Sequence, residues 1–115
     1  MKNRVLYGLV VLLFFSVVQF NISDTYAGKI DYKKIYENQC RKCHEKDGKG
    51  TKRGKKLEVP NFTDFEWQDS VTDEQLITSI TDGKKKMPKQ GHKLSPEEIK
   101  AMVKYIRFFK PKKRR

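Results

Sequence analysis

The clearest pattern of apolar and polar positions lies near the end of the chain. Ser95 precedes it as a helix N-cap, Pro96 takes the first helical position, and Glu98 completes a capping box. Apolar residues then recur at the i, i+3, i+4, i+7 spacing of one buried helix face, and aromatic residues widen the stripe: Ile99, Met102, Val103, Ile106, Tyr105 and Phe109. This pattern predicts a C-terminal amphipathic helix.

A shorter helix is predicted in the middle of the chain. Thr72 and Gln75 have the spacing of a capping box, and Gly83 has the conformational freedom needed to end a helix. Between these signals the apolar positions again follow a helical period: Leu76, Ile77 and Ile80.

A first helix is predicted from about Ile30 to Cys40, with three apolar or aromatic residues on its inner side: Tyr32, Ile35 and Tyr36. Several glycines among charged residues then indicate an irregular loop from Glu45 to Lys56. The segment 59–62, Val-Pro-Asn-Phe, breaks helix and returns apolar groups to the core. No stretch alternates as a strand would, so the predicted fold class is all-α.

The beginning of the chain has the pattern of an export signal. Lys2 and Arg4 form a short positive region, the stretch Val5–Phe20 is mainly apolar, and a polar segment ends at the small residue Ala27. We therefore expect a signal peptide at residues 1–27, cleaved after Ala27. The apolar stretch is shorter than the roughly 20 residues that span a bilayer comfortably, so an uncleaved N-terminal anchor is the alternative. Either arrangement delivers the domain outside the cytoplasm, and a periplasmic location is expected.

The remaining chain is expected to form one small domain over residues 28–110, followed by a basic tail at residues 111–115. A domain of this size buries only a modest core and tends to need a covalent or metal staple.

The strongest chemical signal is the run Cys40-Arg41-Lys42-Cys43-His44, which contains both cysteines of the 115-residue chain. This spacing is the attachment pattern of a c-type haem. Each thiol can add to one vinyl group of the porphyrin, and the turn then holds His44 where an imidazole nitrogen can bind the iron. A covalent haem would also supply the staple and an apolar body around which the domain folds.

A cysteine pair with this spacing has three uses other than haem attachment. A redox-active dithiol usually lies in a βαβ context, whereas the flanks here are charged and helical in pattern. A zinc site needs four ligands, and His92 is the only histidine besides His44. A structural disulfide stays open, because export would permit one. The surrounding pattern favours haem.

The chain is strongly basic, with a formal net charge of +12 at pH 7, and the charge is clustered. The first cluster follows the cysteine pair and consists of Lys52, Arg53, Lys55 and Lys56. The second surrounds Met87 and consists of Lys84, Lys85, Lys86, Lys89 and Lys93. The third forms the tail and consists of Lys110, Lys112, Lys113, Arg114 and Arg115. The tail is suited to an anionic membrane surface. Nucleic-acid binding is the other common meaning of such charge, and the expected export argues against it.

The order of these features resembles a small class I cytochrome c from about Ile30 to Pro111. The shared features are a helix entering Cys-x-x-Cys-His, a middle helix, a loop with Met87-Pro88 and a C-terminal helix. The resemblance implies a cytochrome c-like fold, with helices packed around one covalently attached haem c. It also implies electron transfer by a low-spin iron held between histidine and methionine.

On this resemblance Met87 occupies the axial-methionine position, so the implied iron ligands are His44 and Met87, with the haem attached through Cys40 and Cys43. A thioether ligand raises the reduction potential. His92 is the alternative sixth ligand and would make a bis-histidine site of lower potential. A second methionine, Met102, is expected in the core.

The resemblance also concerns three neighbouring positions. Pro60 matches the family proline whose carbonyl accepts the second ring N–H of the proximal histidine, here His44. Trp67 is expected either at the haem edge or in the aromatic core. Many relatives have a glycine eight residues before the first haem cysteine, where the first and last helices cross, and this chain has Tyr32 there. The crossing is therefore expected to be wider or rotated.

The sequence thus predicts a monohaem c-type cytochrome, a monomeric single-electron carrier outside the cytoplasm and not an enzyme. A filled His/Met pair leaves no coordination position for a substrate. Lysines around Met87 are expected to attract acidic redox proteins, and no nucleic-acid partner is expected. Two alternatives stay open: a cytochrome subunit of a periplasmic oxidoreductase complex, and a haem-based sensor or ligand-binding protein with a labile Met87.

Overall fold

A computed structural model describes residues 28–113 of the chain, and within them it contains helices connected by turns and loops. The expected signal peptide lies outside the described residues, as do Arg114 and Arg115 of the basic tail. In chain order the helices are α2 Tyr32–Gln39, α3 Arg41–His44, α4 Lys52–Lys56, α5 Phe65–Ser70, α6 Asp73–Asp82 and α7 Pro96–Phe108. The described residues contain an isolated antiparallel bridge between Lys84 and Met87 but no strand, so the all-α prediction is confirmed.

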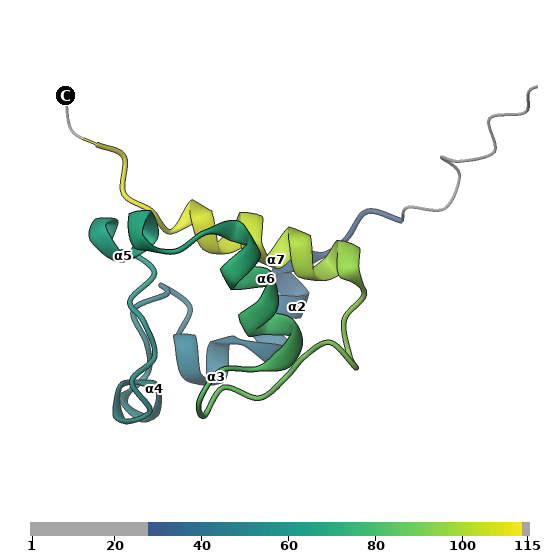
Figure 1. Cartoon of the computed structure of the whole chain (residues 1–115), viewed down its shortest axis with the longest axis horizontal. Helices are drawn as coiled ribbons and strands as arrows, with labels where there is room; N and C mark the ends of the chain where they lie inside the picture. Colours follow the sequence, from purple (N-terminus) through teal and green to yellow (C-terminus); the bar gives the residue numbers. More distant parts are fainter. Residues whose placement is uncertain (1–27, 114–115) are drawn as a thin grey trace, which may run out of the picture.

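The C-terminal helix α7 organises the core. In Figure 1 it crosses the top of the molecule, and both α2 and α6 pack against it. The short helices α3 and α4 contact each other at the lower side of the same view, and α3 also contacts α2. From residue 28 to residue 113, no helix is long and apolar enough to cross a membrane.

Both capping boxes predicted from the sequence are present. Ser95 accepts a hydrogen bond from the Glu98 amide at 3.2 Å, and Glu98 accepts one from the Ser95 amide at 2.8 Å. Thr72 and Gln75 make the same reciprocal pair at the start of α6. The predicted inner faces are largely buried: Leu76 and Ile80 on α6, and Ile99, Met102, Val103 and Ile106 on α7. Ile77, Tyr105 and Phe109, the other members of the predicted stripes, are half-buried and pack against this core.

The crossing of α2 and α7 is filled by tyrosines, and one of them, Tyr32, stands where the resemblance led us to expect glycine. The ring centroids of Tyr32 and Tyr105 are 5.1 Å apart and tilted, and Tyr36 meets Tyr105 edge-on, also at 5.1 Å. Such separations are favourable for aromatic pairs. Met102 of α7 is 1% exposed, which confirms its prediction as a core residue.

The expectation of an irregular loop from Glu45 to Lys56 was only half right, because its second half forms α4. Thr51 is the N-cap and accepts a hydrogen bond from the Gly54 amide at 2.9 Å. The helix sequence Lys-Arg-Gly-Lys-Lys has no apolar stripe, so periodicity could not indicate it. Helix α5 was also missed, since a helix of six residues is too short to show a period.

Gly54 lets α4 pack directly on the backbone of the cysteine pair. A Cβ atom added to Gly54 would lie 1.9 Å from the carbonyl oxygen of Cys43, a distance that no side chain can occupy. The absence of a side chain at this position therefore fixes how closely α3 and α4 approach.

We predict that Gly54→Ala lowers the free energy of unfolding by about 1–3 kcal/mol, as overpacking usually does. Alanine in a helix is otherwise more favourable than glycine, so a loss would come from the clash with Cys43. Urea denaturation of the purified protein measures it, with Gly28→Ala as the control because a Cβ there has no atom within 4 Å. Equal stability of Gly54→Ala and the wild type would show that the α3–α4 contact is not constrained.

Candidate functional site

The cysteine pair lies on the short helix α3 and on the residue before it. The amide of Cys40 donates to the carbonyl of Tyr36 at 2.9 Å, which ends α2, and the amide of His44 donates to the carbonyl of Cys40 at 3.0 Å, which closes the next turn. Cys40, Cys43 and His44 therefore project from consecutive helical turns, and all three border one cavity. Cys40 and Cys43 are not joined to each other in a disulfide.

The carbonyl groups at the end of α3 are satisfied by the segment that follows. The amides of Gly50 and Thr51 donate to the carbonyls of His44 and Cys43 at 3.0 and 2.9 Å. The Tyr36 hydroxyl donates to the carbonyl of Glu45 at 2.7 Å. Since the last carbonyls of a helix have no partner within the helix, these bonds hold a helix of only four residues in place.

His44 is buried, with 7% of its surface exposed. Burial lowers the pKa of its imidazole to about 4, so the ring is neutral at physiological pH, which is the form that binds metals. The ring stacks on Phe62, with centroids 4.6 Å apart and planes 15° apart. Burial also raises the pKa of the Cys40 thiol to about 11, so this thiol stays protonated.

The hydrogen bond predicted between the His44 ring and the Pro60 carbonyl is not formed. Pro60 does border the cavity, but the Nδ1 atom of His44 is buried without a hydrogen-bond partner. Spacing along the chain can place Pro60 beside the same cavity as His44, but it does not specify the direction of the Pro60 carbonyl, on which the hydrogen bond depends.

Met87 lies on a tight turn that is tied to the end of α6. The amide of Met87 donates to the carbonyl of Lys84 at 2.9 Å, and the amide of Lys84 donates back at 3.2 Å. The amide of Gln90 donates to the carbonyl of Ile80 at 2.8 Å. Gly83 has a φ of +79°, and a Cβ there would lie 2.6 Å from the carbonyl oxygen of Met87. The turn thus brings the half-buried Met87 to the same cavity as His44.

The cavity has a volume of about 750 Å³, within the range of about 300–1,000 Å³ that is usual for ligand and cofactor sites. Its wall is largely apolar and comes from several elements, including Phe62, Trp67, Leu76, Ile80, Met102 and Ile106. Trp67 belongs to the aromatic core, since it stacks on Phe62 with ring centroids 5.3 Å apart, and it also borders this cavity.

The residues around the cavity fit a covalently attached haem. Two thiols, a neutral imidazole with no hydrogen-bond partner at Nδ1, and a thioether meet at one apolar space. Histidine and methionine are the axial ligands of cytochromes c. His92, the alternative sixth ligand, is exposed and does not border this cavity.

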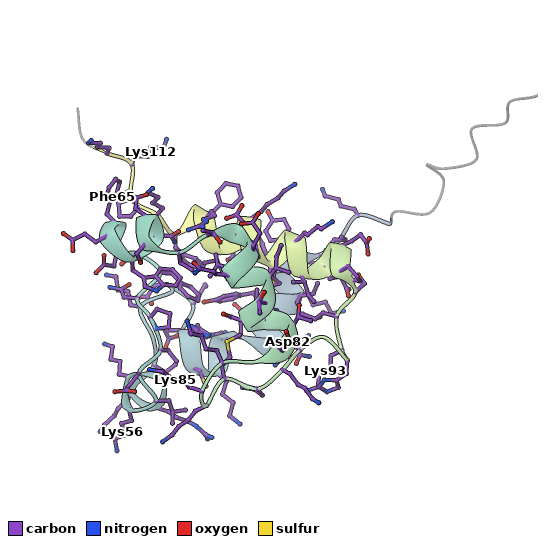
Figure 2. The ribbon with its side chains drawn as sticks, viewed as in Figure 1. Lys56, Phe65, Asp82, Lys85, Lys93 and Lys112 are labelled. Atoms are coloured by element: carbon purple, nitrogen blue, oxygen red, sulfur yellow. The ribbon has the colours of Figure 1, made fainter. Side chains whose placement is uncertain are left out.

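Basic side chains border the same cavity. They come from α3, from α4 and from the Met87 turn: Lys42, Arg53, Lys84, Lys85 and Lys86. Figure 2 shows Lys56 of α4 and Lys85 of the turn at the lower part of the molecule, while Lys112 of the tail lies at the upper left. Two of the three basic clusters predicted from the sequence are therefore next to the cavity.

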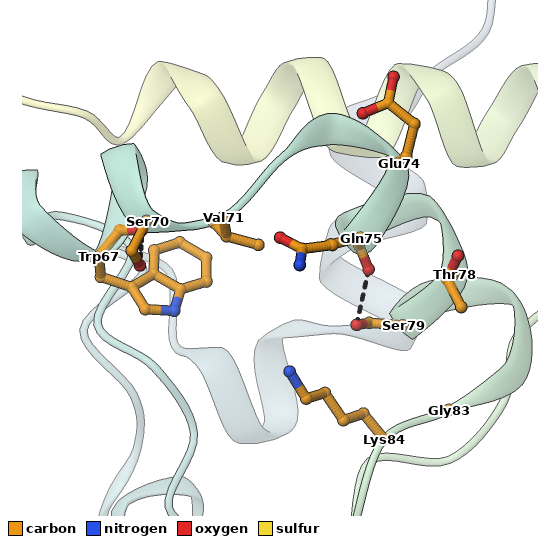
Figure 3. Close-up of a pocket in the computed structure, with 9 residues that line it drawn as sticks. All are labelled: Trp67, Ser70, Val71, Glu74, Gln75, Thr78, Ser79, Gly83 and Lys84. Atoms are coloured by element: carbon orange, nitrogen blue, oxygen red, sulfur yellow. Dashed lines mark hydrogen bonds between the residues drawn. The ribbon is translucent and has the colours of Figure 1, made fainter.

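A shallower hollow of about 500 Å³ adjoins this cavity, and the two share Trp67, Val71, Ser79 and Lys84 as lining residues. In Figure 3 the Lys84 ammonium points into this hollow, between the indole of Trp67 and the hydroxyl of Ser79. The cavity therefore opens toward a polar edge on the α5–α6 side.

Sequence reasoning missed Gln90. Its side chain is 5% exposed and borders the cavity, and its Oε1 atom has no hydrogen-bond partner. Because Gln90 is in a lysine-rich loop, the local pattern indicated solvent exposure. The one sequence signal for Gln90 is its position three residues after Met87, which places it near the proposed ligand.

Residues 30–106 match the protein-family model described as cytochrome c oxidase, cbb3-type, subunit III. A similar curated protein is the cbb3-type cytochrome c oxidase subunit FixP of Bradyrhizobium diazoefficiens, 35% identical over 74 residues. Another is the cbb3-type cytochrome c oxidase subunit CcoP of Rubrivivax gelatinosus, 29% identical over 75 residues. Each alignment covers 64% of this chain but only 24% and 23% of the two relatives, so the chain spans about a quarter of their length.

Solved structures give the same result. The KustC0563 c-type cytochrome is 41% identical to this chain with a TM-score of 0.69, and the match covers 71% of this chain and 100% of that one. A point mutant of the same cytochrome matches with a TM-score of 0.66 and 40% identity, over 70% of this chain and all of that one. The predicted cytochrome c-like fold is therefore confirmed. The chain belongs to the family of cytochrome c oxidase, cbb3-type, subunit III, as a small c-type cytochrome domain of the electron-transferring class.

Proposed function

We propose that this protein is a monohaem c-type cytochrome that carries single electrons outside the cytoplasm. Haem c would be attached through Cys40 and Cys43, and its iron would be bound by His44 and Met87. The observation that supports this assignment most directly is that all four side chains border one apolar cavity.

The residues of the chain suit electron transfer better than catalysis. The bound haem would supply a one-electron iron couple. His44 and Met87 come from the chain itself and would fill both axial positions, which leaves none for a substrate. The apolar wall excludes water, and the thioether favours the reduced state. On this basis the protein is a carrier and not itself an enzyme.

Lysines at the cavity define the surface on which a redox partner would dock. Lys84, Lys85, Lys86 and Lys89 are exposed on or beside the Met87 turn. A positive surface of this kind attracts acidic proteins over a distance of about 10 Å at ordinary salt concentrations. We infer that acidic redox proteins dock there, and that the basic tail, with Lys112 and Lys113 exposed, serves association with an anionic membrane surface.

The second candidate function is that of a cytochrome subunit in a periplasmic oxidoreductase complex. It is favoured by the similar curated proteins, which are named as subunits of cbb3-type cytochrome c oxidases. Purification from the native membrane and soluble fractions distinguishes the two. A free carrier is recovered alone, with residues 1–27 removed, whereas a subunit is recovered with a stable partner.

We predict that Met87→Ala abolishes the weak far-red band of the ferric protein, which reports sulfur bound to haem iron. His92→Ala is the matched control and is expected to keep the band, because His92 is exposed and away from the cavity. Visible spectra of both oxidation states measure this. Loss of the band in His92→Ala instead, or binding of carbon monoxide by the ferrous wild type without denaturant, would contradict Met87 as a stable ligand.

We predict that haem remains with the polypeptide after acid-acetone extraction, because two thioether bonds hold it. The single variants Cys40→Ser and Cys43→Ser each remove one bond, and the double variant should release all haem under the same treatment. Complete extraction from the wild type would contradict covalent attachment and with it the proposed function.

We predict that the double variant Lys85→Gln/Lys86→Gln slows oxidation of the reduced protein by the anion hexacyanoferrate(III) several-fold and speeds oxidation by the cation tris(phenanthroline)cobalt(III). Charge near the exposed site of electron transfer sets the encounter rate. Lys112→Gln/Lys113→Gln carries the same change of charge on the tail, away from the turn (Figure 2). Equal effects of the two variants in stopped-flow measurements would place the docking surface elsewhere.

A further inference from the structure

Gln68 of α5 is 2% exposed, so it is buried more deeply than the other two buried polar residues of the described chain, Gln90 and His44. Its amide nitrogen donates to two carbonyls, that of Phe62 at 2.8 Å and that of Ile106 at 2.9 Å. Its side-chain oxygen accepts from Arg107 at 2.8 Å. The side chain does not border the haem cavity, so its role must be exerted through the groups that it binds.

Arg107 extends this network to the corner between α5 and α6. Its guanidinium donates to the carbonyls of Gln68 and Val71, each at 2.7 Å, and to the Asp73 carboxylate at 2.9 Å. Bonds from a charged donor are stronger than those between neutral groups. The rigid guanidinium of Arg107 thus binds the Gln68 and Val71 carbonyls and the Asp73 carboxylate together. It joins the end of α7 to α5 and to the start of α6.

Phe62 connects the Gln68 network to the candidate iron ligand. Its carbonyl is held by Gln68, and its ring is 4% exposed. One neighbour of the ring is His44, at 4.6 Å and 15°, and another is Trp67, at 5.3 Å and 28°. The imidazole of His44 therefore has an aromatic face beside it, and its Nδ1 atom has no hydrogen bond that would fix the rotation of the ring.

We propose that Phe62, and not a hydrogen bond to Nδ1, sets the plane of the His44 imidazole, and that Gln68 is a positioning residue that fixes Phe62. Arg107 supports Gln68 from the other side. The inference rests on the proposed function, in which His44 binds the haem iron. In cytochromes the histidine ring is usually oriented by a hydrogen bond from its second nitrogen. Here the packing of a neighbouring ring takes that role.

The orientation of an axial imidazole has its own spectroscopic signature. In a low-spin ferric haem the unpaired electron density follows the planes of the axial ligands. The paramagnetic NMR shifts of the haem methyl groups and the g values in electron paramagnetic resonance therefore change when the imidazole rotates. A loss of stability alone does not reorder these signals, so they separate positioning from packing.

The first comparison uses the ferric holoprotein of Phe62→Leu and Phe109→Leu. Both substitutions remove one buried or half-buried phenyl ring, and the two rings are neighbours with centroids 5.9 Å apart. Only Phe62 stacks on His44. We expect Phe62→Leu to reorder the haem-methyl shifts and to alter the g values, and Phe109→Leu to leave both as in the wild type. Unchanged signals in Phe62→Leu, or equal changes in both variants, would overturn the proposal.

The second comparison uses Gln68→Met, which keeps the length of the side chain but loses its hydrogen bonds. Ser70→Ala on the same helix removes only a hydrogen bond to the Trp67 carbonyl and is the control. We expect Gln68→Met to shift the haem-methyl signals in the same direction as Phe62→Leu, to a smaller extent. If Gln68→Met does not fold, Arg107→Lys weakens the same network from outside the core. If the folded variant, Gln68→Met or Arg107→Lys, has the same haem-methyl signals as the wild type, Gln68 does not position Phe62.

Failure of the proposed function would look different. A wild-type protein without strongly shifted haem-methyl signals would show that no low-spin haem is bound. Wild-type signals of the His/Met type together with an unaltered Phe62→Leu spectrum would leave the cytochrome assignment intact and refute only the Phe62 inference.

Discussion

The contact between α4 and the backbone of α3 is the constraint on which the rest of the site depends. A helix of four residues cannot hold two cysteines and a histidine in fixed directions by its own hydrogen bonds. The Gly50–Gly54 segment supplies what is missing, because its amides and the Thr51 hydroxyl bind the last carbonyls of α3 and Gly54 permits the close approach. Tyr36 anchors the same turn from α2. The three side chains at the cavity are therefore oriented by backbone contacts from both flanks.

The parts of the fold that local sequence determines were predicted correctly. Helices α6 and α7 begin at capping boxes and carry apolar stripes, so their starts and buried faces followed from spacing alone. Helix α4 has neither an apolar stripe nor an acidic first turn, and it forms because Thr51 caps it and because it packs on Cys43. That contact joins residues from different elements, and a pattern along the chain does not contain it.

The same distinction applies to the site. Cys40, Cys43 and His44 were found because their spacing is short and specific, and Met87 because its loop resembles that of a known class. The surroundings of these residues were harder to predict. The absent bond to Pro60, the buried Gln90 and the ring of Phe62 against His44 all depend on how loops turn in space. Such features follow from tertiary packing and not from residue type at a given distance.

The turn that carries Met87 also concentrates like charge. Lys84, Lys85, Lys86 and Lys89 are exposed on or beside it, and Lys85 has a strained positive φ of 54°. The positive charges of these lysines repel one another. The turn keeps its shape because of the paired hydrogen bonds between Lys84 and Met87 and the hydrogen bond from the Gln90 amide to α6. An anionic surface that neutralises these lysines lowers the repulsion and makes the closed turn more stable. In the proposed docking, an acidic partner would therefore stabilise the same turn that holds Met87, and by thermodynamic reciprocity the ordered turn would bind that partner more tightly.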